Sequence, residues 1–178
     1  IRAATAAPPP DVTLERLLKI LESIGRRESY IALLVEYPQA LAAVARLVSL
    51  SPWACDYLAR HPMLLDELID TRQLTVPDWP AVDAKLAADL AEVDGEVEAQ
   101  MDLLRHCKHT QTFRLLALDL MGGLTVESLS DHLSDLACLL LRHSLALTWA
   151  RLPTRHREAP SFAIIGYGKL GGKELGYE

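Results

Sequence analysis

Glycines and lysines gather near the end of the chain in a pattern that suits a phosphate group. Between residues 166 and 173, four glycines surround two lysines. Glycine permits positive φ angles and lets another group approach the main chain closely, and successive backbone N–H groups in such a turn attract anions. The candidate nucleotide-binding residues are Gly171, Gly172, Lys169 and Lys173.

A short apolar run, residues 162–165, comes directly before these glycines. The run is bounded by Pro160 on one side and by Gly166 on the other, and its length and apolar character predict one buried β-strand. The residues before it carry helical patterns. We therefore expect a strand and a glycine turn to open a second kind of fold at the end of a helical chain.

Three kinds of glycine turn can be compared with this pattern. Residues 166–171 satisfy the dinucleotide fingerprint G-x-G-x-x-G after the predicted strand, but the fingerprint also needs an acidic residue about 20 positions later, beyond residue 178. A P-loop is excluded, since neither Lys169 nor Lys173 is followed by Ser or Thr at the required glycine spacing. A tight strand-to-helix turn that binds nothing is the structural alternative.

The longer string of residues 166–177 reads Gly-Tyr-Gly-Lys-Leu-Gly-Gly-Lys-Glu-Leu-Gly-Tyr. It resembles the bifunctional glutamine synthetase adenylyltransferase/adenylyl-removing family, where it opens a nucleotidyltransferase domain of the polymerase-β type. The hydrophobic-Gly-Gly signature of that superfamily falls on Leu170, Gly171 and Gly172. The resemblance is to the C-terminal, adenylylating half, and it implies that these glycines present backbone N–H groups to the phosphates of ATP.

This resemblance implies an enzyme that transfers AMP from ATP to a tyrosine of glutamine synthetase, while its other half removes AMP, under control of the PII signal protein and glutamine. The tyrosine oxygen would attack the α-phosphorus in line. The family holds its magnesium ions with a Ser-Asp-hydrophobic-Asp motif that would follow Tyr177. The family usually has a small residue where this chain has Glu178, which suggests that the chain was cut at this point. We therefore expect a fragment without catalytic or metal-ligating residues and without transferase activity by itself.

Two other functions stay open. The chain could be a regulatory or interaction module that transmits the PII and glutamine signals without contacting ATP, or it could begin a dinucleotide-binding domain. A basic helical stretch, also similar to the family, carries Arg105, Lys108 and Arg114. These side chains either approach a triphosphate or pair with acids such as Asp102 and Asp119, and helix charges are more often structural.

Composition and charge limit the class of protein. Half of the 178 residues are hydrophobic, and 18 basic against 24 acidic residues give a net charge of −6, which argues against a nucleic-acid-binding surface. Cys55, Cys107 and Cys138 form no C-x-x-C pair, as is typical of a reducing compartment. No apolar run approaches the roughly 18 residues of a membrane span. We expect a soluble cytoplasmic chain with protein partners and neither a nucleic-acid nor a membrane partner.

The elements that position the glycines are predicted to be mainly α-helical, an irregular multi-helix bundle with two long helices. We expect a linker at 1–10, a helical region at 11–152 with a possible subdivision in the loop 70–79, and the truncated start of the nucleotidyltransferase domain at 153–178. The predicted helices cover residues 11–24, 29–37, 38–50, 52–61, 63–69, 80–121 and 125–152.

Local residue chemistry marks the ends of these helices. Asp11, Ser51 and Thr125 are candidate N-caps, because a short side-chain oxygen can accept a hydrogen bond from the first turn. The glycine pair at 122 and 123 is a candidate stop. Gly95 is the weak point of the predicted helix 80–121, since glycine costs about 1 kcal/mol in a helix interior.

Overall fold

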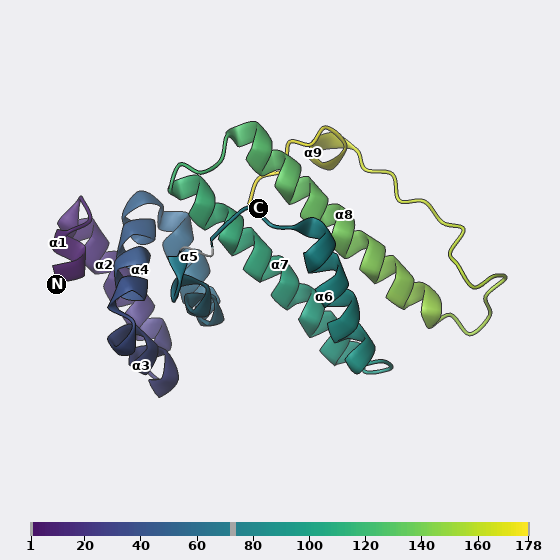
Figure 1. Cartoon of the computed structure of the whole chain (residues 1–178), viewed down its shortest axis with the longest axis horizontal. Helices are drawn as coiled ribbons and strands as arrows, with labels where there is room; N and C mark the ends of the chain where they lie inside the picture. Colours follow the sequence, from purple (N-terminus) through teal and green to yellow (C-terminus); the bar gives the residue numbers. More distant parts are fainter. Residues whose placement is uncertain (1, 72–73, 178) are drawn as a thin grey trace. The chain divides into compact units, whose positions relative to one another are not determined.

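The computed structural model describes residues 2–71 and 74–177, and within these ranges the regular elements are all helical (Figure 1). In chain order they are α1 (Arg2–Thr5), α2 (Pro10–Ile24), α3 (Glu28–Glu36), α4 (Pro38–Leu50), α5 (Pro52–Arg60), the 3₁₀ helix η1 (Pro62–Leu68), α6 (Trp79–Glu92), α7 (Val97–Leu120), α8 (Val126–Ala150) and α9 (Gly168–Gly171). The prediction of a mainly α protein is confirmed.

The chain folds as two compact units. Unit 1 comprises Ile1–Val76 and Leu116–Gly123, and unit 2 comprises Pro77–Leu115 and Leu124–Glu178. The first division between them falls inside the predicted loop 70–79. The candidate nucleotide-binding glycines and lysines all belong to unit 2.

Unit 1 is built around α2, α4 and α5, which pack on one another. The buried apolar residues of these helices include Ile20, Ile24, Val44, Leu47 and Leu58. Across the unit, the Arg16 guanidinium donates to the Val48 carbonyl oxygen at 2.5 Å. The helices of unit 1 are therefore fixed by apolar contacts, with polar bonds at their edges.

Prolines and capping side chains set several helix starts. Pro38, Pro52 and Pro62 each begin a helix, because proline loses no hydrogen bond in a first turn. The Ser51 hydroxyl accepts from the Ala54 N–H at 3.1 Å, and the Thr125 hydroxyl accepts from the Ser128 N–H at 3.2 Å. These two predicted caps are confirmed.

Two details at the start of the chain differ from the sequence-based expectation. Residues 2–5, predicted to lie in an extended linker, form α1, with Ala4 buried. Small alanines favour the helix and fit closely against α2 and α4. Asp11 lies in the first turn of α2 and is not its cap, because Pro10 already begins the helix.

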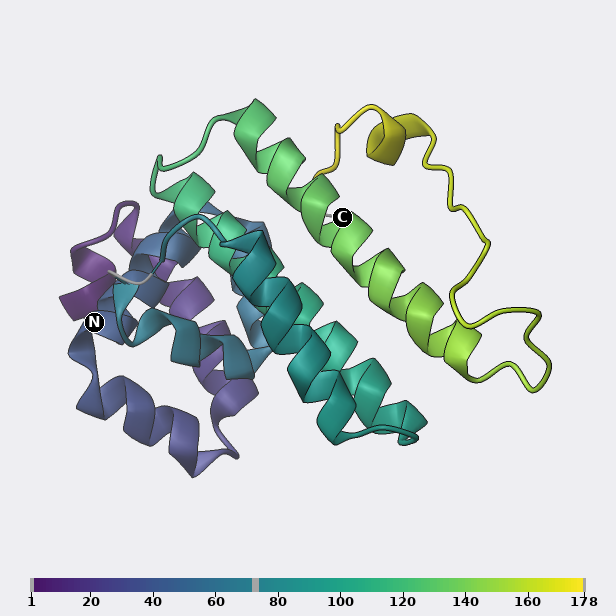
Figure 2. The same cartoon turned by 45° about the vertical axis from the view of Figure 1, so that its right-hand side comes forward.

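The predicted long helix 80–121 is broken. It forms two helices, α6 and α7, which are separated at Gly95, where φ is +83°. A left-handed φ ends a helix at little cost only at glycine. In two views α6 and α7 lie side by side (Figures 1 and 2), and Leu103 and Leu104 pack against Leu86 and Leu90. The break thus produces a helical hairpin that a single helix could not form.

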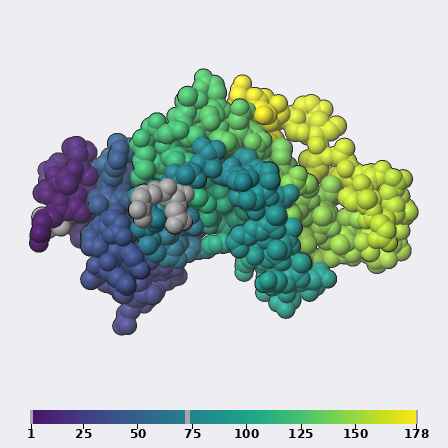
Figure 3. All heavy atoms as spheres, viewed as in Figure 1, coloured from purple at the N-terminus to yellow at the C-terminus, as the bar shows by residue number. Residues whose placement is uncertain are grey.

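The segment after α8 returns along that helix. From Ala150 the chain runs back beside α8 in both views, and α9 lies near the first half of α8 (Figures 1 and 2). In the space-filling view this returning segment is the yellow outer part of unit 2 (Figure 3). Helix α8 is therefore the neighbour of the candidate glycine turn.

The strand predicted at 162–165 is not formed. These residues lie between Ser161 and Tyr167 in a stretch with neither helix nor strand, and Phe162, Ile164 and Ile165 are exposed. A strand needs a partner for its backbone N–H and C=O groups, and the described residues supply no second strand. The prediction of a strand here was therefore wrong, because backbone pairing and not the apolar pattern alone decides whether a strand forms.

Among the described residues, no single helix has the length and hydropathy needed to span a bilayer. The consecutive helices α3 and α4 meet the length and composition criteria only when taken together, and they are bent by 101° relative to each other.

Candidate functional site

The glycine turn is a tight loop that surrounds the single turn of α9. Gly168 has a φ of +58° and Lys173 a φ of +53°, so the chain enters and leaves α9 through left-handed residues. Between them, the Gly172 N–H donates to the Gly168 carbonyl oxygen at 2.8 Å, and the Glu174 N–H donates to the Lys169 carbonyl oxygen at 2.7 Å. The turn is thus closed by its own backbone hydrogen bonds.

Gly171 is the position at which this turn admits no side chain. A Cβ atom there would lie 3.0 Å from the carbonyl carbon of Gly166, and closer still to its carbonyl oxygen. At Gly172 a Cβ atom would meet the Gly168 oxygen at 3.3 Å, a contact that a small shift relieves. The requirement for glycine is therefore strictest at Gly171, where two stretches of main chain touch.

The backbone N–H groups of the two predicted glycines are used inside the turn. The Gly171 N–H points to the Tyr167 carbonyl oxygen at 3.5 Å, and the Gly172 N–H bonds to Gly168. In this conformation the glycines contribute to the site by letting two stretches of main chain lie close together. Sequence reasoning could not show where the N–H groups of these glycines point.

The two candidate lysines have different surroundings. The Lys173 ammonium lies 3.2 Å from an oxygen of Asp131 on α8, and this hydrogen bond raises the pKa of Lys173. Lys169 is exposed, and the part of the chain that the structure describes offers it no ion pair. Lys169 is therefore the cation that stays available to a ligand, while Lys173 is held by α8.

Residues after the turn are packed on the first half of α8. The side chains of Leu175 and Tyr177 contact the buried cluster of Leu115, Leu129 and Leu133. On α8, the Ser130 hydroxyl donates a hydrogen bond to the Leu175 carbonyl oxygen at 3.1 Å. The downstream arm of the turn is thus attached to α8 by both apolar and polar contacts.

A cavity of about 360 Å³ lies between the upstream arm of the turn and the middle of α8. Its lining combines the turn with one cationic side chain of α8, that of Arg142. Sequence reasoning did not single out Arg142, because nothing in its spacing links it to the glycines. The lining residues are Cys138, Leu141, Arg142, Leu145, Ile164, Gly166, Leu170 and Gly171.

Three polar contacts join α6 to α8. The Trp79 indole N–H donates to His132 Nδ1 at 3.1 Å. His143 Nε2 lies 2.6 Å from an oxygen of Asp83, and the Arg142 guanidinium lies 3.0 Å from the same oxygen. Because a carboxylate only accepts, His143 must donate here through its Nε2 proton. Its hydrogen bond, followed by the charge of Arg142, lowers the pKa of Asp83.

We expect Asp83→Asn to lower the free energy of unfolding at pH 7 by about 0.2–1 kcal/mol, the value of a solvent-screened ion pair, because Asn keeps an acceptor oxygen but loses the charge. A carboxyl with a lowered folded-state pKa stabilises the fold above its unfolded pKa of about 3.9, and that contribution disappears as the pH falls through the folded-state value. The difference in the free energy of unfolding between the variant and the parent should therefore become smaller below about pH 4.

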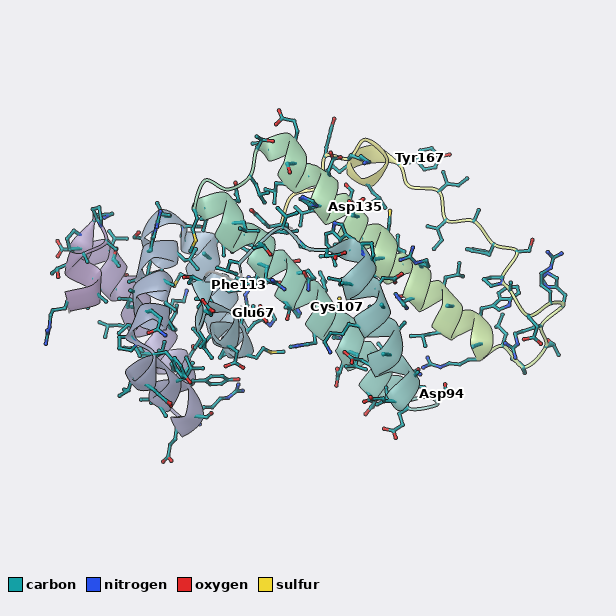
Figure 4. All side chains as sticks on the ribbon, viewed as in Figure 1. Glu67, Asp94, Cys107, Phe113, Asp135 and Tyr167 are labelled. Carbon is teal, nitrogen blue, oxygen red and sulfur yellow. The ribbon has the colours of Figure 1, made fainter. Side chains whose placement is uncertain are left out.

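Urea titrations at several pH values, followed by circular dichroism, measure this difference. Asp94→Asn is the matched control, because Asp94 is an exposed carboxylate in the turn after α6 (Figure 4). If Asp83→Asn lowered the free energy of unfolding by the same amount at every pH, the stabilising role of the Asp83 charge would be contradicted.

In the basic stretch of α7, Arg105 makes an ion pair within its own helix. The Arg105 guanidinium lies 2.6 Å from an oxygen of Asp102, one turn away, as the interpretation in terms of ion pairing predicted. Lys108 is exposed, and Arg114 is partly buried. Cys107 packs against the cluster of Leu86, Leu90 and Leu139, and burial raises the pKa of its thiol to about 11. A thiol so rarely ionised is a poor nucleophile.

The described residues do not fit a metal ion. No group of three or more His, Cys, Asp or Glu side chains lies close enough to ligate one among them. The dinucleotide motif also needs a full helix after its glycines, whereas α9 has four residues.

Comparison with known proteins gives one consistent family. Residues 41–178 match the profile of the glutamate-ammonia ligase adenylyltransferase family. The chain is 56% identical over 178 residues to a bifunctional glutamine synthetase adenylyltransferase/adenylyl-removing enzyme of Chromobacterium violaceum, with 99% of this chain and 20% of that protein covered. It is 57% identical over 175 residues to the enzyme of the same name from Nitrosomonas europaea, covering 96% of this chain and 19% of that protein.

A third relative with this name, from Neisseria meningitidis serogroup B, is 52% identical over 178 residues, with 99% of this chain and 20% of that protein covered. The chain spans about a fifth of the length of these curated relatives. The family profile covers well over half of the chain, and it includes the glycine turn and all of unit 2. The resemblance seen in residues 166–177 is thereby confirmed, and the chain belongs to the glutamate-ammonia ligase adenylyltransferase family.

Proposed function

We propose that this chain is the part of a glutamine synthetase adenylyltransferase that leads into the adenylylating active site. The parent enzyme would transfer AMP from ATP to a tyrosine of glutamine synthetase, its other half would remove AMP, and PII protein and glutamine would regulate both. The observation that carries the proposal is the contact of Gly171 with the main chain of Gly166, in a string that matches this family.

In this proposal the residues of the turn have separate tasks. Gly171 keeps the turn narrow, so that its exposed outer surface can receive a phosphate. Lys169 supplies positive charge to the triphosphate, since its ammonium is exposed. Lys173 lies at the end of the turn, and its ammonium group is paired with Asp131. The turn therefore binds and orients ATP and does not itself move a proton.

The family implies magnesium for the transfer step, but the described residues do not fit the ion. In this proposal the described residues contribute to the reaction by holding the nucleotide. The 178-residue chain assayed alone is expected to transfer no AMP, since the resemblance places the magnesium carboxylates after Tyr177.

Transfer of labelled AMP from ATP to purified glutamine synthetase tests the proposal. The full-length protein that carries this chain should label glutamine synthetase, and Lys169→Gln should raise the KM for ATP about tenfold, the effect of one charge-assisted bond to phosphate. Glu158→Gln, an exposed position in the returning segment, is the control. If the full-length protein does not label glutamine synthetase, or if Lys169→Gln leaves the KM for ATP unchanged, the proposal is refuted.

A further inference from the structure

The glycine turn is held in place from one side only. Its downstream arm is bound to α8 through the Lys173–Asp131 ion pair and the bond from Ser130 to the Leu175 carbonyl. Its upstream arm, residues 161–167, is exposed along its whole length, and Tyr167 points away from the helices (Figure 4). Movement of the turn relative to α8 is therefore limited chiefly by the contacts of residues 173–177.

Lys173 is an unusual residue for the conformation that it adopts. Its φ of +53° lies in the left-handed region, which non-glycine residues enter at a cost in energy. If only the backbone path mattered, glycine would fit this position better, as it does at Gly168. A lysine here indicates that its side chain has a task, and the contact that its ammonium makes is with Asp131.

Asp131 is suited to this contact by its place on α8. It follows Ser130, which binds the Leu175 carbonyl, and it lies between Leu129 and Leu133, which bind Leu175 and Tyr177. The apolar contacts and the ion pair thus fix the same short segment at adjacent points. The apolar contacts set its distance from α8, and the ion pair sets the direction in which the turn leaves the helix.

We propose that Asp131 is a positioning residue for AMP transfer, which fixes the glycine turn against α8 by holding Lys173. This inference rests on the proposed function for its effect on ATP, but the anchoring itself does not. Loss of the anchor lowers the fraction of molecules whose turn can bind ATP, and the apparent affinity for ATP falls in the same proportion. Chemistry after binding is unchanged.

Amide exchange in the full-length protein tests the anchor without any activity measurement. Asp131→Asn and Lys173→Gln should each speed exchange in residues 168–177 severalfold, while exchange in α8 stays the same. Asp135→Asn is the matched control, because this carboxylate acts on Lys173 only through its charge, one helical turn further along α8 (Figure 4). Equal effects of Asp131→Asn and Asp135→Asn, or no effect of Asp131→Asn, would overturn the anchor.

Steady-state kinetics of the same variants test the consequence for ATP. Asp131→Asn and Lys173→Gln should each raise the KM for ATP about two- to fivefold, as the strength of an exposed ion pair allows, with kcat within about twofold. The double variant should be no worse than either single variant, because both remove one interaction. A much larger loss with Lys173→Gln than with Asp131→Asn would make Lys173 a direct phosphate ligand and overturn the proposal.

The exchanged pair, Asp131→Lys with Lys173→Asp, separates the two roles most clearly. Aspartate tolerates the left-handed conformation well, so the swap keeps the turn and reverses only the charges. If Lys173 acts as an anchor, the swap restores the ion pair, and both the amide exchange rate and the KM for ATP should return toward those of the parent. If Lys173 binds phosphate, the swap does not restore binding, since an acid would then face ATP. Restored slow exchange with no AMP transfer from the parent protein itself would refute the proposed function and leave the anchor standing.

Discussion

Replacing Gly171 with alanine in the full-length protein should lower kcat/KM for AMP transfer about 100-fold, the usual consequence of displacing a binding group by about 1 Å. The added Cβ atom would overlap the carbonyl group of Gly166. Neither group can rotate away, because the Cβ atom is bonded directly to the backbone and the carbonyl group belongs to it. The turn must open, and the surface offered to the phosphates moves with it.

The neighbouring glycine provides the control for this prediction. Gly172 has a φ of −83°, which alanine adopts freely, and its Cβ atom needs a shift of only a few tenths of an ångström. Gly172→Ala should therefore cost much less than Gly171→Ala. Circular dichroism of both variants should match the parent, since the turn is exposed. Equal activities of the two variants would contradict the packing role of Gly171.

The order of these two effects could not be obtained from sequence. The hydrophobic-Gly-Gly signature points equally to Gly171 and Gly172, and resemblance made Gly172 the position expected to lie against phosphate. Which glycine touches other main chain depends on how Gly166 folds back, a contact five residues away in sequence. Sequence patterns report which backbone angles are needed, whereas close approaches need coordinates.

Helix boundaries show where sequence reasoning is strong. Pro38, Ser51 and Thr125 act within one turn of their own position, so the starts of α4, α5 and α8 follow from local chemistry. Gly95 was recognisable as a weak point for the same reason. The choice between one long helix and a hairpin was not local, because it depends on whether Leu103 and Leu104 pack against Leu86 and Leu90.

The anchoring of Lys173 was invisible in the sequence for a related reason. Asp131 lies 42 positions before it, on a helix whose acidic residues give no sign of their partners. The sequence made Lys173 a candidate for contact with phosphate, and the structure shows the carboxylate of Asp131 that pairs with it. Charges at long separation are paired by the fold, so their roles cannot be assigned before the fold is known.

Replacing Leu139 with alanine should lower the free energy of unfolding by about 2–5 kcal/mol. Leu139 is 4% exposed and packs with Leu86 and Leu90, so its side chain joins α8 to α6. Truncation loses the buried surface and leaves a cavity between helices that cannot fully close. Urea unfolding measures the loss, and Val126→Ala on the same helix, 73% exposed, should stay within about 0.5 kcal/mol of the parent.

Leu139→Ala also separates two functions of α8. Leu139 holds α6, whereas Asp131 and Leu133 face the segment after the glycine turn. At a temperature where it is folded, Leu139→Ala should therefore keep the KM for ATP of the full-length parent, while Asp131→Asn should raise that KM with little change in stability. If Leu139→Ala raised the KM as much as Asp131→Asn does, α8 would act on the turn as a whole through its packing, and the anchor at Asp131 would lose its separate role.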